Sequence, residues 1–482
     1  MDFTAHLAYL PRIIEEVGAD MAEIAERQAE LRIENGWKSH FVETLALGLP
    51  LIGAQLAQNG IHVTDIVIIG RIGTTELAAM VLAAQFYFTI FIFGSGFAAA
   101  VVPLAAQAFA RGDVQQVRRA TRMGLWVVMA FSALTMPLIF LAEPVLLALG
   151  QNPHVAELAA SYLHIAGWSM FPALGFMVLR SFLSAVGRAG FVLYVTLIIL
   201  VVNAAFAYVL VLGHFGMPAL GLRGAAMVAL GVNILSLVLT VWYIAALPEL
   251  RRFEIFVRFW RAEPLMLKEV FNLGLPISLT ILAEVSLFTV ASLLMGWIGT
   301  AELAAHGIAL QCASLAFMIP LGLAQAATVR VGVAAGANDR EALIRASWVV
   351  VMISAGIAII GGLVFSMFPS FFAGLFLDRT KDDAATVLGL ATTFVIVAGI
   401  FQLVDGLQAI GAGLLRGIKD TRIPMLLALI SYWGIGFVLA YVLAFPLGWG
   451  GIGIWLGFVF GLLAASFLLL GRFVILVRRM QV

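Results

Sequence analysis

Charged side chains are scarce in this 482-residue chain, in which only 11% of the residues are Asp, Glu, Lys or Arg and 62% are hydrophobic. Soluble domains carry roughly 25% charged residues, so this composition excludes an ordinary water-soluble fold and indicates a protein embedded in the lipid bilayer. The net charge of +1 shows no basic excess, and no nucleic-acid partner is expected. A single cysteine, Cys312, excludes an intramolecular disulfide and a cysteine metal cluster.

The sequence also lacks the motifs of several classes of protein. No Gly-x-x-x-x-Gly-Lys-Ser/Thr stretch is present to hold nucleotide phosphates, which disfavours an ATP-driven pump. A membrane-embedded enzyme is an alternative from another class, but neither His-Glu-x-x-His nor Gly-x-Ser-x-Gly occurs, so no enzymatic activity is expected. Residues 1–38 mix acids and bases without an uninterrupted apolar run. We interpret them as a cytoplasmic amphipathic segment and not as a secretory signal.

About twelve apolar runs, each long enough to cross a bilayer with roughly 20 residues, follow one another along the rest of the chain. Lys and Arg test this count, because short cytoplasmic loops hold most of them. With the N-terminus inside, 24 of the 28 Lys and Arg residues fall on inner segments. The four on outer segments are Arg71, Arg223, Arg379 and Lys381. The pattern predicts an all-α integral membrane protein of the inner membrane, with twelve transmembrane helices and both termini cytoplasmic.

The two halves of the chain repeat each other. Leu47-Gly48-Leu49-Pro50 recurs as Leu273-Gly274-Leu275-Pro276, and the segment 70–79 recurs as 296–305, both at an offset of 226 residues. Each half holds six spans in the same orientation, so the halves should be related by an axis along the membrane normal. We therefore expect two pseudo-symmetric six-helix lobes that face each other across a central cleft.

The repeat also predicts a division of the chain. Residues 39–247 form the expected N-terminal lobe, the charged stretch 248–268 a cytoplasmic linker, and residues 269–482 the C-terminal lobe. Pro50 and Pro276 occupy equivalent places in the first span of each lobe, where each removes a backbone hydrogen bond and permits a bend. They are either hinges for alternating access or static kinks.

Three acids lie well inside the apolar spans: Asp65 in the first, Glu284 in the seventh and Asp405 in the tenth. A charged side chain at the centre of a span costs about 2.5–3.5 kcal/mol, and no Lys or Arg is expected at the same depth. Each carboxylate must therefore be protonated, hydrogen-bonded or neutralised by a mobile cation. The acids are candidates for exchanging Na+, H+ or a cationic drug; the alternative is a permanently protonated carboxyl that joins two helices.

The repeat separates these acids into two groups. Asp65 aligns with Ala291, whereas Glu284 aligns with Gln58, so the two lobes place their acids at different depths. Glu284 and Asp405 both belong to the C-terminal half and are expected to share one site.

Four stretches around these acids resemble the NorM branch of the multidrug and toxic compound extrusion (MATE) family. The resemblance extends over residues 40–475 and implies a V-shaped fold of the MATE/MOP type, drug efflux and cation antiport. The stretches are Gly60-Ile61-His62-Val63-Thr64-Asp65 with Gly70, Ala283-Glu284-Val285-Ser286-Leu287-Phe288, Glu302-Leu303-Ala304-Ala305-His306, and Asp405-Gly406-Leu407-Gln408 running into Gly413-Leu414-Leu415-Arg416-Gly417-Ile418-Lys419-Asp420.

The resemblance also implies roles for single residues. Glu284 and Asp405 correspond to the pair that holds the coupling cation, and Asp65 corresponds to an acid linked to protonation or drug release. Asn203 matches a polar residue packed near that acid. Phe401 stands where some members carry a Tyr near the cation, so the aromatic face is kept and the hydroxyl is lost.

Further candidate drug contacts are neutral or aromatic. Gln58 and Gln311 are expected as polar contacts in the cleft, with helix–helix hydrogen bonding as the alternative for Gln311. Phe288 and Phe401 offer faces for cation–π attraction, and packing is their alternative role.

The sequence thus predicts a secondary transporter that acts as a monomer in the lipid bilayer and exports small cationic amphipathic drugs by Na+ or H+ antiport. No cofactor besides the coupling ion is expected, and the resemblance favours Na+. A lipid-linked oligosaccharide flippase of the same superfamily is the nearest alternative, and it would need several Arg or Lys in its cleft.

Overall fold

The structure is a computed structural model that describes residues 36–214, 216–377 and 384–480. Most of the predicted amphipathic segment, residues 1–35, lies outside the described residues, as do Arg379 and Lys381. All regular secondary structure in the described ranges is helical. Twelve helical stretches there are long and apolar enough to cross a membrane, which confirms the predicted number of spans.

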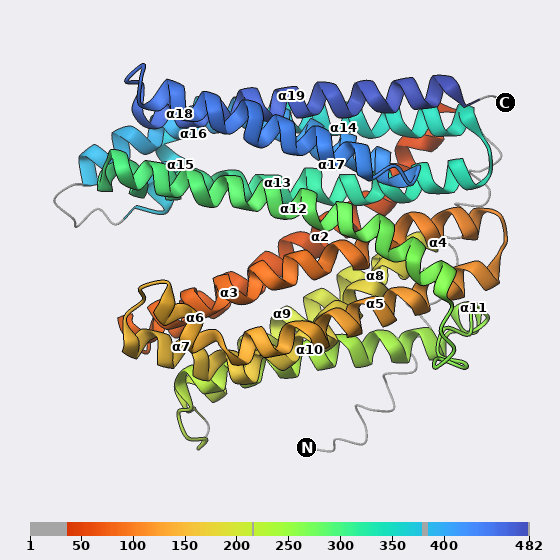
Figure 1. The fold of residues 1–482 in the computed structure, drawn as a ribbon, viewed down its shortest axis with the longest axis horizontal. Coiled ribbons are helices and arrows are strands. Elements are labelled where there is room, and N and C mark those ends of the chain that lie inside the picture. Colours follow the sequence, from red (N-terminus) through yellow and green to blue (C-terminus); the bar gives the residue numbers. More distant parts are fainter. Residues whose placement is uncertain (1–35, 215, 378–383, 481–482) are drawn as a thin grey trace.

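The first six spans occupy the lower bundle of Figure 1. Short helices α6 and α11 flank them, and α11 lies in the predicted linker. The bounds are α2 (Trp37–Ile69), α3 (Thr74–Ala99) continued by α4 (Val101–Ala110), α5 (Val114–Phe140), α6 (Ala142–Ala148), α7 (Pro153–Ala166) continued by α8 (Met170–Ala185), α9 (Ala189–Leu212), α10 (Gly221–Ala246) and α11 (Pro248–Arg251).

The other six spans form the upper bundle, coloured green to blue in Figure 1. One of them contains a stretch of π-helix, Ile430–Phe437, between α17 and α18. The bounds are α12 (Pro264–Ile298), α13 (Thr300–Gly336), α14 (Arg340–Met367), α15 (Pro369–Leu375), α16 (Ala384–Gly417), α17 (Arg422–Leu429), α18 (Val438–Ala444) and α19 (Gly450–Arg479).

Equivalent helices of the two halves begin in the same way. The Asp113 side chain accepts a hydrogen bond from the Gln116 N–H at the start of α5, and Asp339 caps α14 through the Ala342 N–H. Such caps satisfy one of the backbone donors that a helix start leaves open. Gly73 and Gly299 precede α3 and α13 with the same extended backbone. The sequence repeat is therefore a repeat of local structure.

The two bundles diverge toward the end that carries α6 and α15 and come together at the end that carries α11 (Figure 1). This is the predicted two-lobe, V-shaped arrangement. Two helices cross between the lobes where they meet. Ile52 of α2 packs in a core cluster with Leu323 of α13, whereas Val270 and Leu273 of α12 belong to the core of the first bundle.

Glycines allow the crossing helices to approach closely. A Cβ atom on Gly322 of α13 would lie 2.7 Å from the backbone nitrogen of Ile52, and one on Gly96 of α3 would collide with the backbone of Ser278 in α12. Gly96 and Gly322 are separated by the repeat offset, as are Ile52 and Ser278. The junction where the two lobes come together, here called the inner junction, therefore contains the same backbone contact twice: Gly322 with Ile52 and Gly96 with Ser278.

We predict that Gly322→Val separates α13 from α2 and destabilises the folded protein by about 1–3 kcal/mol, the usual cost of inserting atoms into a packed interface. Thermal unfolding of the purified protein in detergent measures the change. Gly307→Val on the same helix is the control, because a Cβ there meets no atom within 4 Å. Equal melting temperatures for the two variants would contradict the close-contact explanation.

Candidate cation-binding site

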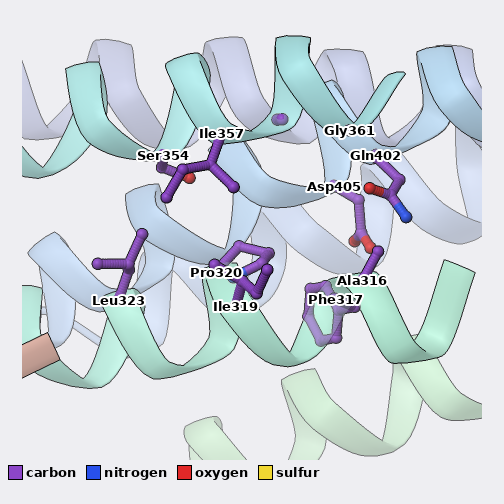
Figure 2. A pocket seen from close by; sticks show the side chains of 11 residues that line it. Ala316, Phe317, Ile319, Pro320, Leu323, Ser354, Ile357, Gly361, Gln402 and Asp405 are labelled. Carbon is purple, nitrogen blue, oxygen red and sulfur yellow. The ribbon is translucent and has the colours of Figure 1, made fainter. Parts of the chain in front are cut away.

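Asp405 lies in the middle of α16 and faces a small cavity between α13, α14 and α16. The side chain is 4% exposed, and its Oδ1 has no hydrogen-bond partner among the described residues. Figure 2 shows the carboxylate pointing toward α13, beside Gln402. The cavity has a volume of about 60 Å³, which is room for a small ion with water. A buried carboxylate oxygen without a hydrogen-bond partner is suited to bind a cation or a proton.

Oxygen-bearing side chains surround the same cavity. Ser354 lines it from α14, and its hydroxyl has no hydrogen-bond partner within the described ranges. Gln402 precedes Asp405 by three residues on α16 and also lines the cavity. Carboxylate, hydroxyl and amide oxygens are suitable ligands for a hard cation such as Na+. No group of three or more His, Cys, Asp or Glu side chains that could hold a metal occurs in the described part of the chain.

Glu284 of α12 lies close enough to Asp405 for the two charges to interact. Both charges also act on Tyr432, which is fully buried in the π-helical stretch and hydrogen-bonded to Gln408. The two acids that the sequence assigned to one site are therefore within electrostatic reach of each other, but Glu284 does not line the Asp405 cavity. An added cation between them would relieve their repulsion.

A basic residue is nearer to this pair than the sequence indicated. Arg416, the next-to-last residue of α16, lies within electrostatic reach of Glu284. The sequence does not show this proximity, because Glu284 and Arg416 lie on two different helices, α12 and α16, of the same bundle. No ion pair joins Asp65, Glu284 or Asp405 to a basic residue in the described part of the chain.

Aromatic side chains lie one helical turn from each of the two acids. Phe288, one turn after Glu284, and Phe401, one turn before Asp405, have ring centroids 6.0 Å apart. Phe401 also lies 5.6 Å from Trp455 and is only 2% exposed. The ring of Phe401 therefore packs within the lobe, and Phe288 is the more accessible of the two. Their predicted contact with drug stays a prediction.

The N-terminal lobe holds its acid in a different way. The Asn203 amide of α9 donates a hydrogen bond of 2.7 Å to Oδ1 of Asp65 in α2. Tyr162 of α7 lies near enough for the Asp65 charge to act on its hydroxyl. The predicted proximity of Asn203 to the N-lobe acid is thus present in the structure. Asp65 is half-buried.

The other candidate residues are spread along the lobes. Gln58 is exposed on α2, and Gln311 is half-buried on α13. Pro50 and Pro276 lie inside α2 and α12, which run without interruption through both positions. Whether the two prolines act as hinges stays a prediction.

Sequence reasoning missed several polar residues around Asp405. Gln402, Asp405 and Gln408 follow one another at intervals of three, which places them along one side of α16. That spacing was a signal for the neighbours on the same helix. Ser354 and Tyr432 belong to other spans, and only the fold shows that they lie here.

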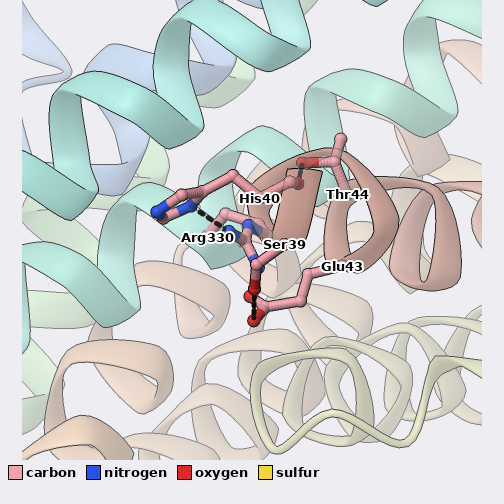
Figure 3. Close-up of polar contacts among 5 residues, drawn as sticks. All are labelled: Ser39, His40, Glu43, Thr44 and Arg330. Atoms are coloured by element: carbon pink, nitrogen blue, oxygen red, sulfur yellow. Dashed lines mark hydrogen bonds and ion pairs between the residues drawn. The ribbon is translucent and has the colours of Figure 1, made fainter. Parts of the chain in front are cut away.

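The inner junction of the lobes carries polar contacts between α2 and α13. Arg330 of α13 donates hydrogen bonds to Glu43 and to Nδ1 of His40, both on α2, as Figure 3 shows. The buried Arg180 of α8 also donates hydrogen bonds, to Gln55 of α2 at 2.6 Å and to Gln325 of α13 at 3.1 Å. These contacts join the two lobes at the end where the lobes come together.

Comparison with known proteins identifies close relatives. The MatE family pattern matches residues 50–209 and 276–442. Proteins named probable multidrug resistance protein NorM from Rhizobium meliloti (strain 1021) and Agrobacterium fabrum (strain C58) are each 60% identical, over 448 and 443 residues. These alignments cover 93% and 92% of this chain and 96% and 95% of the relatives. A protein of the same name from Pseudomonas aeruginosa is 38% identical over 423 residues, covering 88% of this chain and 86% of the relative.

Solved structures share the fold. A crystal structure of MATE in the straight conformation superposes with a TM-score of 0.84 at 18% identity, covering 93% of this chain and 98% of that one. The eukaryotic MATE transporter AtDTX14 superposes with a TM-score of 0.81 at 22% identity, covering 92% and 99%.

Twelve spans in two lobes, with acids inside the spans, define a multi-pass membrane transporter of the inner membrane and not an enzyme. The chain belongs to the MatE family, the multidrug and toxic compound extrusion family, and is similar in sequence to its NorM-type members.

We predict that Asn203→Ala lowers the free energy of unfolding by about 1–3 kcal/mol, because it removes the donor to the Asp65 carboxylate. Asn233→Ala is the matched control in the same lobe, since that amide donates to Ala229 of its own helix. Thermal unfolding of both variants, alone and combined with Asp65→Asn, gives the coupling between Asn203 and Asp65. A coupling energy of zero would refute the assigned interaction.

Proposed function

We propose that this protein is a multidrug efflux transporter that exports organic cations in exchange for Na+ or H+, with both termini in the cytoplasm. The carrying observation is Asp405, a buried carboxylate whose Oδ1 lacks a partner in the described part of the chain and which faces a cavity. The relatives named multidrug resistance protein support the drug as substrate.

In this proposal the coupling cation binds between Glu284 and Asp405. Na+ is the favoured ion, because Ser354 and Gln402 supply neutral oxygens next to the Asp405 carboxylate. A proton would need only one of the carboxylates and none of these neutral ligands. Cation binding neutralises the acid pair and so changes the relative stability of conformations in which the acids are arranged differently.

Asp65 is the proposed acid for the drug or for a proton. Its hydrogen bond to Asn203 holds the carboxylate in place without neutralising it, which leaves the negative charge available to an organic cation. Gln58 and Phe288 are proposed drug contacts. Asp65 and the coupling-ion site then lie in different lobes, and the exchange of drug for ion is linked through the relative position of the lobes.

The lobes meet at the end that carries α11 and diverge at the other (Figure 1). With the cytoplasm at the α11 end, this is a conformation closed to the inside. Export by alternating access requires the contacts of Arg330 and Arg180 across the junction to break and re-form in each cycle. The flippase alternative needs basic side chains free for a pyrophosphate, whereas the buried Arg180 already donates to two glutamines.

Ethidium efflux from proteoliposomes under separately imposed Na+ and H+ gradients tests the coupling. We expect a Na+ gradient to drive efflux, and Asp405→Asn or Glu284→Gln to reduce that efflux at least about tenfold, because the cation loses a charged ligand. Glu157→Gln, at an exposed acid, is the control and should transport normally. Wild-type rates in both site variants would reject the cation site, and efflux under neither gradient would reject antiport.

A second experiment tests the closed inner junction. We predict that Glu43→Gln, which removes the acidic partner of Arg330, increases labelling of a cysteine placed at Ala326, which packs with Leu51 of α2, by a membrane-impermeant maleimide applied from the cytoplasmic side. The background is Cys312→Ala, which removes the native thiol. Glu341→Gln is the control, because Glu341 pairs with Arg345 within α14 and not across the junction. Equal labelling in both variants would mean that the Glu43–Arg330 pair does not hold the junction closed.

A further inference from the structure

A second cavity lies far from the acid pair, at the end of the molecule where α12 begins. It has a volume of about 580 Å³, within the range of small-molecule pockets. The wall on one side is the first part of α12, and the other side is the turn from α16 into α17. The lining residues are Leu265, Lys268, Glu269, Asn272, Leu273, Lys419, Asp420, Thr421, Arg422 and Ile423.

Positive charge is in excess around this cavity. Glu269 forms an ion pair with Lys419 at 3.1 Å, and Asp420 forms one with Arg472 at 2.5 Å, so each acid is already neutralised. Lys268 and Arg422 are exposed and form no ion pair with any residue of the described ranges. Two cationic groups on opposite walls are therefore left for an anion.

A buried hydroxyl points to the same ligand. Thr421 lines the cavity, is 5% exposed, and its Oγ1 has no hydrogen-bond partner among the described residues. A buried hydroxyl without a partner costs free energy unless a ligand or water completes it. Asn272 adds a side-chain amide from the opposite wall. Hydroxyl, amide, ammonium and guanidinium together make a set of donors suited to a phosphate.

The flank of the cavity is apolar. Leu265 is 87% exposed and Ile423 is 40% exposed, and both lie beside the charged residues. The cavity sits at the ends of membrane-spanning helices, where lipid headgroups meet the acyl chains. A free phosphate would contact the charged residues and leave the apolar flank without a partner, whereas a phospholipid contacts the charged residues with its headgroup and the apolar flank with its acyl chains. We propose that this cavity binds the headgroup of an anionic phospholipid, with the phosphate at Lys268, Thr421 and Arg422 and the acyl chains along Leu265 and Ile423.

The position of this lipid site gives it a mechanical consequence. The start of α12 packs on the first bundle through Val270, whereas Thr421 and Arg422 belong to the second. A headgroup held by both walls bridges the lobes at the inner junction and stabilises the conformation seen here. The lipid site does not depend on which ion or drug the protein carries.

The test compares lipids added to the purified full-length protein in detergent. We expect phosphatidylglycerol to raise the melting temperature of the wild type by several degrees in a saturable manner, and phosphatidylcholine or inorganic phosphate at equal concentration to raise it little. Lys268→Gln combined with Arg422→Gln should abolish the increase. Arg251→Gln combined with Arg478→Gln, which removes two exposed charges elsewhere, should keep it.

Two further variants keep the result decisive if the double glutamine variant is unstable. Lys268→Arg with Arg422→Lys preserves both charges and should retain the response, and Thr421→Val should weaken it while leaving the charges intact. An equal response to inorganic phosphate would assign the cavity to a free anion and overturn the lipid proposal. An undiminished phosphatidylglycerol response in the double glutamine or Thr421→Val variants would overturn the site itself. Each outcome concerns binding alone, so it is independent of the proposed antiport.

Discussion

The structure depends on the cost of placing a carboxylate inside a membrane. Asp65, Glu284 and Asp405 lie within membrane-spanning helices, and none forms an ion pair with a basic residue in the described part of the chain. A fixed ion pair would make such an acid inexpensive to keep but inert. Hydrogen bonding alone, as Asn203 provides to Asp65, leaves the negative charge in place. In the proposed antiport, a proton or a cation that can leave again offsets the cost of these acids in the bilayer.

The lobe architecture follows directly from the sequence, whereas the surroundings of the acids do not. Twelve apolar runs and the repeat from Pro50 to Pro276 predicted two six-helix lobes, because these signals are local in the chain. The polar residues near Asp405 that lie on other spans are Ser354 of α14 and Tyr432 of the π-helical stretch. Each is more than twenty residues from Asp405 in the chain. Hydrophobic periodicity says that such helices pack, but not which faces meet.

Because the sequence does not show which helix faces meet, it also did not predict the neighbours of Arg416 or the contacts at the junction between the lobes. By position in the chain, Arg416 is an inner-end residue eleven positions after Asp405, yet packing of α12 against its bundle brings Glu284 within reach of its charge. The crossing of α2 and α12 between the lobes could not be predicted either. The chain has 47 glycines, and taken singly the ones that permit the crossing do not differ in pattern from the others. Only the paired positions of Gly96 and Gly322 in the repeat carry that signal.

The repeated scaffold carries different chemistry in its two halves, and this difference has a physical reason. Two lobes with identical acids would bind the same ion, and movement of one lobe against the other would then exchange like for like. Here the N-lobe acid is hydrogen-bonded and half-buried, whereas in the C-lobe Glu284 and Asp405 are within electrostatic reach of each other and Asp405 faces a small cavity. In the proposed antiport, a junction that opens and closes, combined with these asymmetric sites, would couple a small cation to a large one.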